Sequence, residues 1–297
     1  MFMKNFLLFS FSIVFGLFVG EIALRIVGFG YPFFWDIDKI TGGSLAPGVE
    51  GWQRDEGEAY IKINSFGQRD EEHLIEKPFG VYRVAVLGDS YSEAMHVDLK
   101  ATFWKILESK LNYDCSSKRN FKIEVLNFGV TGFGTAQEYL TLKHKVWKFD
   151  PDLIVLAVTT GNDIRNNSKI LEPEKLRPFY YLKNGGLELD NSFKDSQGFT
   201  LRKMLYPVIR NFRVFQIAHR YIYSLMTARI QKEMAEQEEA IRTDDKKYNK
   251  TGELYNPPKS IVMKEAWTIT EKLFLLIRDE VKSKKKQLLV VTLSNPD

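Results

Sequence analysis

Short apolar runs alternate with longer amphipathic segments after residue 80 of the chain. The apolar runs are rich in valine, isoleucine and leucine, which is typical of strands that are covered on both faces. We expect four strands, in the segments VYRVAVLGD, KIEVLNFGV, DLIVLAVTT and QLLVVTLS. Helical spacing is found in TFWKILESKLN, TAQEYLTLKHKVWKF and KEAWTITEKLFLLIRDEVKSKK. Strands that alternate with helices imply right-handed crossovers and a parallel sheet, so residues 80–297 are expected to form a doubly wound α/β domain.

The second predicted helix also has a candidate start signal. Thr135 and Glu138 are three residues apart, which is the spacing of a capping box. We therefore expect the helix to begin immediately after Thr135.

The first 28 residues form the most apolar segment of the chain. The run FLLFSFSIVFGLFVG alone is shorter than the ~30 Å hydrocarbon core of a bilayer. The helical pattern continues through EIALRIVG, where Glu21 and Arg25 have the i,i+4 spacing of an ion pair. A helix over residues 1–28 would span a bilayer, and we expect it to be an uncleaved membrane anchor. A cleaved signal peptide and a plain buried helix are the alternatives.

Two further regions differ in pattern from the α/β core. Residues 29–79 are rich in Gly, Pro, Asp and Glu, and they are interpreted as a linker and irregular lead-in. Residues from about 166 to 260 are too many for a connecting loop, and most of residues 201–241 have a helical pattern. We expect a helical insertion that caps the domain beside its site. Its basic, amphipathic part could instead lie on a membrane surface, although packing of its apolar face on the domain is favoured.

Composition excludes several classes of partner. The 297-residue chain has a net charge of +4 and lacks a basic run interleaved with aromatic residues, so no nucleic-acid partner is expected. The single cysteine, Cys115, cannot form an internal disulfide. The motifs C-x-x-C and H-E-x-x-H are absent, and the sequence therefore predicts no metal site.

Polar clusters follow three of the predicted strands at the point where each strand ends. They are GDSYS at residues 88–92, NFGVTG at 127–132 and TGND at 160–163. In a parallel sheet these ends meet at one edge, where ligands bind. The clusters supply a hydroxyl, a glycine N–H and a carboxamide, which are the groups that acyl transfer requires. Ser90 is the candidate nucleophile, and the candidate oxyanion donors are the N–H groups of Ser90 and Gly132 and the side-chain amide of Asn162.

These clusters and their order resemble the SGNH (GDSL-type) hydrolase family. GDSYSEA resembles the first block of the family, NFGVTGFGT the second and GND the third, and INSFGQRD is similar to its membrane-anchored bacterial branch. The resemblance implies a flavodoxin-like three-layer α/β/α sandwich with a parallel sheet and no cofactor. It also implies that Ser90 is the nucleophile and one oxyanion donor, and that Gly132 and Asn162 are the other donors. Substrates in this family are esters, often acetyl groups on carbohydrates, lipids or cell-wall polymers.

A serine nucleophile needs a general base, and the family supplies it from an Asp-x-x-His block after the last strand. The last predicted strand is followed only by NPD, so we expect the base to lie beyond Asp297. One D-x-x-H, from Asp70 to His73, precedes the first core strand and is interpreted as solvated charge. His96 is expected on a surface loop and His144 on a helix face. His219 is expected in the insertion, from which it could reach the site.

The sequence therefore predicts a membrane-anchored ester hydrolase whose domain lies outside the cytoplasm, with an ester substrate and a membrane as its partners. An O-acyltransferase that passes the acyl group to a polysaccharide hydroxyl is the first alternative. A non-catalytic carbohydrate-binding remnant of the same fold is the second. The missing base favours the remnant, whereas the intact set of Ser90, Gly132 and Asn162 opposes it.

Overall fold

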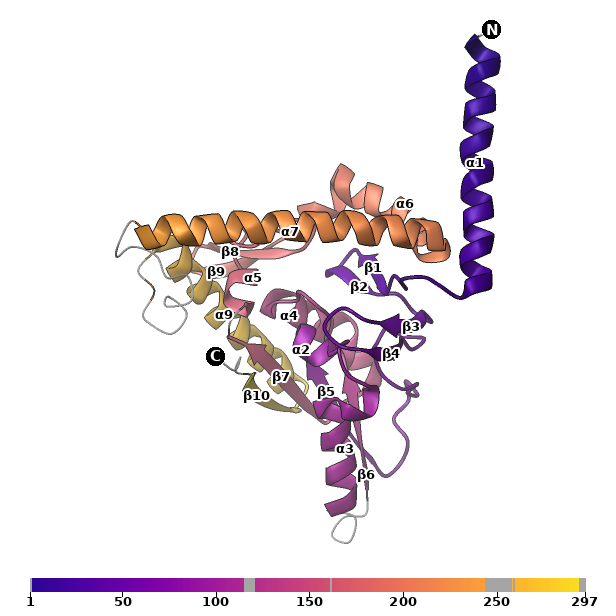
Figure 1. Cartoon of the computed structure of the whole chain (residues 1–297). Coiled ribbons are helices and arrows are strands. Elements are labelled where there is room, and N and C mark those ends of the chain that lie inside the picture. Colours follow the sequence, from indigo (N-terminus) through magenta and orange to yellow (C-terminus); the bar gives the residue numbers. More distant parts are fainter. Residues whose placement is uncertain (1, 115–120, 161, 244–257, 259, 294–297) are drawn as a thin grey trace. The chain divides into compact units, whose positions relative to one another are not determined.

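A computed structural model describes residues 2–114, 121–160, 162–243, 258 and 260–293 of the chain (Figure 1). The chain divides into two compact units. One unit holds residues 1–34 and 203–248, and the other holds residues 35–202 and 249–297. The second unit carries the parallel sheet, and the first carries the apolar N-terminal helix.

The sheet of the second unit is parallel, with the strand order β10-β7-β5-β6. Each strand coincides with one of the predicted apolar runs, because branched apolar side chains fit a pleated surface. The strands are β5 (Val81–Leu87), β6 (Lys122–Asn127), β7 (Leu153–Thr159) and β10 (Gln287–Leu293). The strands β5, β6 and β7 are mostly buried, whereas the edge strand β10 is largely exposed.

Helices cover both faces of this sheet. They are α3 (Phe103–Asp114), α4 (Thr135–His144) and α9 (Ile261–Ser283). Successive strand residues point to opposite faces, so Leu87 joins a buried cluster with α4 and α9, whereas Val86 joins another with Trp104 of α3. The predicted three-layer α/β/α sandwich with a parallel sheet is therefore confirmed.

The start of α4 differs from the predicted capping box. The residue that caps it is Gly134, whose N–H donates to the side chain of Gln137 at 3.2 Å. Thr135 and Glu138, the predicted pair, are both buried within the helix. Position 134 requires glycine, because a Cβ there would lie only 2.8 Å from the Cβ of Asn166.

The lead-in is more ordered than the irregular linker expected from its sequence. It forms two antiparallel hairpins, and Leu45, Ile61 and Ile63 are buried. Strands of only four residues are too short to show a clear period in the sequence. These strands are β1 (Trp35–Asp38), β2 (Gly42–Leu45), β3 (Glu50–Gln53) and β4 (Ala59–Lys62).

The insertion is not helical throughout. It follows the short helix α5 (Asp163–Asn166), and its first part contains a hairpin of β8 (Phe179–Lys183) and β9 (Gly186–Asp190), which the sequence did not predict. The helical pattern of residues 201–241 is confirmed, because α6 (Gln197–Asn211) and α7 (Arg213–Thr243) follow. Residues 203–248 belong to the first unit, so a cap beside the site stays a prediction. Short 3₁₀ helices complete the description: η1 (Leu99–Ala101), η2 (Val146–Phe149) and η3 (Ser192–Asp195).

The first unit contains α1 (Phe2–Val27) and α7, which contact each other. Among the described residues, α1 is the one helix long and apolar enough to cross a membrane. The mean hydropathy of its most apolar 18 residues is 2.2, and none of that part is buried. A signal sequence has the same character, so this helix alone does not separate an anchor from a cleaved leader.

Candidate active site

Ser90 stands at the sharp turn between β5 and the short helix α2 (Ser90–Glu93). Gly88 follows the last residue of the strand. A Cβ added at this position would lie 2.9 Å from the Cβ of Ser92, so the turn requires glycine here. Asp89 caps α2 through its side chain. Ser90 therefore takes the first helical position, where backbone N–H groups have no partner within the helix. It is half-buried at the carboxyl edge of the sheet.

Asp89 joins this turn to the end of β7. Its Oδ1 accepts the hydroxyl of Thr159 at 3.1 Å, and its Oδ2 accepts the Nδ2 hydrogen of Asn162 at 2.9 Å. Asp89 is fully buried. An amide nitrogen carries two hydrogens, so the bond to Asp89 fixes the Asn162 side chain while the second hydrogen points elsewhere. Ser90 and Asn162 thus lie on loops that one carboxylate connects.

Gly132 lies on the loop between β6 and α4. Its φ of 77° is in the left-handed region that favours glycine, and a Cβ there would meet no atom within 4 Å. The backbone angle, rather than crowding, therefore requires glycine at this position, and there is room beside the loop for a ligand. The loop is held to the Ser90 turn, because the N–H of Val130 donates to the carbonyl of Gly88 at 3.2 Å.

The structure therefore places Ser90, Gly132 and Asn162 on three loops at the same edge of the sheet. Hydrogen bonds join the first loop to each of the others. This arrangement is the one that the motif order predicted, and the catalytic roles of the three residues remain a prediction.

Glu93 is a buried carboxyl that the sequence analysis did not identify. Its Oε2 accepts the hydroxyl of Thr131, the residue before Gly132. Burial raises the pKa of Glu93 to about 7, against the opposing effects of the Thr131 hydrogen bonds and the Arg69 charge. A glutamate in a short polar helix is usually exposed, so nothing in the local pattern marked it. Glu93 links the helix that carries Ser90 to the loop that carries Gly132.

Arg69 supports the far end of α2 from the lead-in. Its Nη1 donates to the carbonyl of Glu93 at 2.8 Å and to that of Ala94, and its Nη2 donates to the carbonyl of Val97. Burial lowers the pKa of Arg69 to about 10, so the guanidinium stays charged at neutral pH. Its planar fork fixes the positions of these carbonyls and hence the end of α2.

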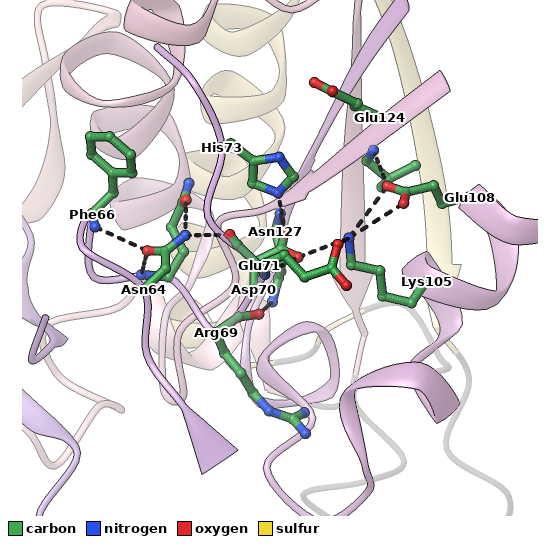
Figure 2. Close-up of polar contacts among 12 residues, drawn as sticks. Asn64, Phe66, Arg69, Asp70, Glu71, His73, Lys105, Glu108, Glu124 and Asn127 are labelled. Carbon is green, nitrogen blue, oxygen red and sulfur yellow. Dashed lines mark hydrogen bonds and ion pairs between the residues drawn. The ribbon is translucent and has the colours of Figure 1, made fainter. Parts of the chain in front are cut away.

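Figure 2 shows that the D-x-x-H segment belongs to a buried polar network. Asp70 is 3% exposed and accepts the N–H of Asn127 at 2.9 Å. It also lies 3.1 Å from Lys105 Nζ and 3.3 Å from His73 Nε2. For Asp70 the prediction of solvated charge is therefore wrong, because the Lys105 ammonium and a backbone donor contact the carboxylate and allow its burial, whereas Glu71 and Glu72 of the same segment are exposed. In the described part of the chain, neither Asp70 nor His73 hydrogen-bonds to Ser90.

Two further buried carboxyls, those of Asp163 and Glu138, have raised pKa values. Asp163 Oδ2 accepts the N–H of Thr159 at 2.7 Å, and burial with the charge of Asp89 raises its pKa well above the usual value. Burial and the charges of Asp163 and Asp89 raise the pKa of Glu138 in the same direction. Among the residues with described positions, no group of three or more His, Cys, Asp or Glu side chains could hold a metal ion.

The four histidines all lie in the described ranges, and none hydrogen-bonds to Ser90 Oγ there. His96 is exposed after α2, and His144 is exposed at the end of α4, as predicted. His219 belongs to the first unit, where its ring packs against Phe33 and burial lowers its pKa. The general base is therefore not assigned to any of them.

No protein-family model and no curated protein matches the chain. Solved structures do match it. TesA is 24% identical over 28% of this chain and 42% of its own, with a TM-score of 0.24. The esterase AlinE4 is 23% identical over 30% of this chain and 44% of its own, with a TM-score of 0.25. A GDSL-like lipase from Bacteroides thetaiotaomicron is 11% identical over 70% of this chain and 67% of its own, with a TM-score of 0.23.

This chain is similar to an esterase and to a GDSL-like lipase. The matched part spans less than half of the length of TesA and of AlinE4. TM-scores of this size describe loose superpositions, so no residue role is carried over from these proteins. The chemistry of the site therefore depends on the motifs and on the contacts around Ser90.

Proposed function

We propose that the chain hydrolyses esters through an acyl intermediate on Ser90. The observation that carries this proposal is the Asp89 bridge, which holds the Asn162 amide beside the turn that presents Ser90. The glycine loop, with Gly132 in a left-handed conformation, is hydrogen-bonded to the same turn. A protein that only binds carbohydrate has no need for a nucleophile surrounded by such donors.

The contacts suggest a role for each group. Ser90 Oγ attacks the ester carbonyl carbon while its proton passes to a general base. The N–H groups of Ser90 and Gly132 and the Asn162 amide stabilise the negative charge on the carbonyl oxygen. The alcohol leaves with a proton, and an acyl group remains on Ser90. Water then attacks this new ester, releases the acid and restores the Ser90 hydroxyl.

We further propose that α1 anchors the chain in a membrane and that the α/β domain acts outside the cytoplasm on O-acylated carbohydrate, lipid or cell-wall material. The apolar side chains exposed along α1 support the anchor. Retention of the full-length chain in membranes after an alkaline carbonate wash is expected. Release of a chain shortened at its N-terminus would instead indicate a cleaved signal peptide.

A fluorophosphonate probe tests the nucleophile directly. The folded, full-length chain should be labelled at Ser90, as located by mass spectrometry, and Ser90→Ala should abolish both labelling and hydrolysis of p-nitrophenyl acetate. Ser109→Ala is the matched control, because Ser109 is exposed on α3 away from the three loops and its loss should change neither. Absence of labelling in a chain with intact circular dichroism would refute the proposal.

A further inference from the structure

The helical part of the first unit exposes several apolar side chains. Several of them are spaced by three or four residues, which places such pairs on the same side of a helix. They include Met204, Leu205 and Val208 of α6, Phe212 between the two helices, and Ile222 and Met226 of α7. Apolar side chains so grouped mark an interaction surface, because an isolated soluble helix does not keep such a face in water.

The charge of the same region has one sign. Between residues 203 and 231 the chain has five Arg or Lys residues and no Asp or Glu. Anionic lipid head groups attract positive charge that is concentrated in this way. An apolar face beside basic residues is the pattern of a helix that lies in a membrane interface.

Hydrogen bonds hold this region to the last turns of α1. Arg213 Nη1 donates to the carbonyl of Leu24 at 2.7 Å, and the N–H of Val214 donates to Glu21 Oε2 at 3.1 Å. Arg25 Nη2 donates to the carbonyl of Asn211 at 2.8 Å. The corner between α6 and α7 is therefore fixed to the end of the apolar helix, which is the level where a helix that spans a bilayer reaches the head groups.

We propose that the end of α6 and the first half of α7 lie in the head-group region of the bilayer, with their apolar side chains in the acyl boundary and their basic side chains on anionic lipid. We call residues 203–229 the interfacial segment. The proposal rests on the proposed insertion of α1 and goes beyond it, because it gives the chain a second contact with the same leaflet. Continuity with α1 and the positive charge favour lipid over a second copy of this chain, which carries the same positive charge.

The test uses the full-length chain with Cys115→Ser, reconstituted in phosphatidylcholine vesicles with or without phosphatidylglycerol. Single cysteines that carry an environment-sensitive fluorophore replace Val208 and Ile222 of the interfacial segment. Phe11→Cys in α1 reports insertion, and Ser109→Cys on exposed α3 is the water-facing control. Nitroxide lipids should quench the probes at 208, 222 and 11 but not at 109.

The pattern of quenching distinguishes contact of the interfacial segment with lipid from insertion of α1 alone and from contact with a second copy of the chain. Quenching at 11 without quenching at 208 and 222 would overturn the interfacial segment and leave the anchor intact. Absence of quenching at all three positions would overturn both. Self-quenching at 208 that grows with protein concentration, without quenching by lipid, would point to a second copy and also overturn the proposal.

The contribution of the basic side chains is tested by comparing vesicles with and without phosphatidylglycerol. Quenching at 208 should be at least about twofold stronger in vesicles that contain phosphatidylglycerol, because basic side chains are drawn to an anionic surface. Lys203→Gln combined with Arg210→Gln should remove this difference while quenching at 11 is unchanged. An equal response to both kinds of vesicle in the unaltered chain would contradict recognition of anionic lipid.

Discussion

Asn162 has two tasks if the proposed chemistry is right, since its amide bonds to Asp89 and also faces the developing oxyanion. Asn162→Ala should therefore lower kcat for ester hydrolysis at least tenfold, in line with the ~10²–10³ loss typical of one oxyanion donor. Thr159→Val is the matched control, because it removes another donor to Asp89 without touching the oxyanion. Steady-state kinetics and thermal unfolding of both variants check this. An unchanged kcat in Asn162→Ala would exclude Asn162 from the oxyanion site.

Thr131 offers a test of how the Gly132 N–H is positioned. Its hydroxyl donates to buried Glu93, yet the residue is exposed, so Thr131→Val should fold normally and lose only this bond. We expect kcat to fall by roughly threefold to tenfold with little change in KM, since a hydrogen bond to a charged or polar partner contributes about 1 kcal/mol. Thr131→Ser keeps the hydroxyl and should restore the rate. Equal rates in the valine and serine variants would show that this contact has no positioning role.

The lead-in matters to stability through one side chain in particular. Arg69→Met keeps an unbranched apolar stem but removes the donor to the carbonyls of Glu93 and Val97, whereas the Ala94 carbonyl still accepts the N–H of Val97. Since an unsatisfied buried polar group costs about 1–3 kcal/mol, the free energy of unfolding should fall by at least about 2 kcal/mol. Arg54→Met is the control, because exposed Arg54 pairs with exposed Glu58 and lies over the exposed ring of Trp52, and its loss should cost less than about 1 kcal/mol. Urea unfolding measures both, and similar losses would contradict the role of Arg69.

The strands and helices of the core could be predicted because each one produces a recognisable pattern of apolar and polar residues in the sequence. The β8–β9 hairpin also had a local signal, since Asn184 and Gly185 both have positive φ and Asn-Gly is typical of such turns. The helical pattern that follows at residues 201–241 is much longer, so it determined the prediction for the insertion as a whole. The positions of Ser90, Gly132 and Asn162 at one edge followed from strand order alone.

The buried charges could not be predicted in the same way. Asp70 is buried because Lys105 and the N–H of Asn127 surround it, and both lie far from it in the sequence. Arg69 and Glu93 likewise depend on partners from other elements. Local composition assigns such residues to solvent, so the polar network beneath α2 becomes visible only when the lead-in and the core are seen together.

For the molecule as a whole, the raised pKa of Glu93 implies a pH-dependent stability. Because burial raises the pKa from 4.5 to about 7, folded Glu93 keeps its proton where the unfolded chain has lost it. Its contribution therefore favours folding at low pH and is lost as pH rises through 7. Between pH 5 and pH 8, this effect should lower the free energy of unfolding by on the order of 3 kcal/mol.

Glu93→Gln should remove this dependence, since glutamine is neutral at both pH values. The free energy of unfolding of this variant, relative to the unaltered chain, should rise between pH 5 and pH 8, as measured by urea unfolding in detergent. Glu188→Gln changes an exposed carboxyl whose pKa is lowered by Lys183, and it should show no such gain. An identical difference between Glu93→Gln and the unaltered chain at both pH values would show that Glu93 has an ordinary pKa.

The contacts of Arg69 and Asp70 also decide where the α/β domain begins. A chain cut at residue 80, where the first core strand starts, would retain the sheet, its helices and Ser90. It would lose the side chains that hold the end of α2 and the N–H of Asn127. Any excised, fused or circularly permuted version of this domain therefore has to carry residues 64–73, because the support of the Ser90 turn is encoded before the fold that presents it.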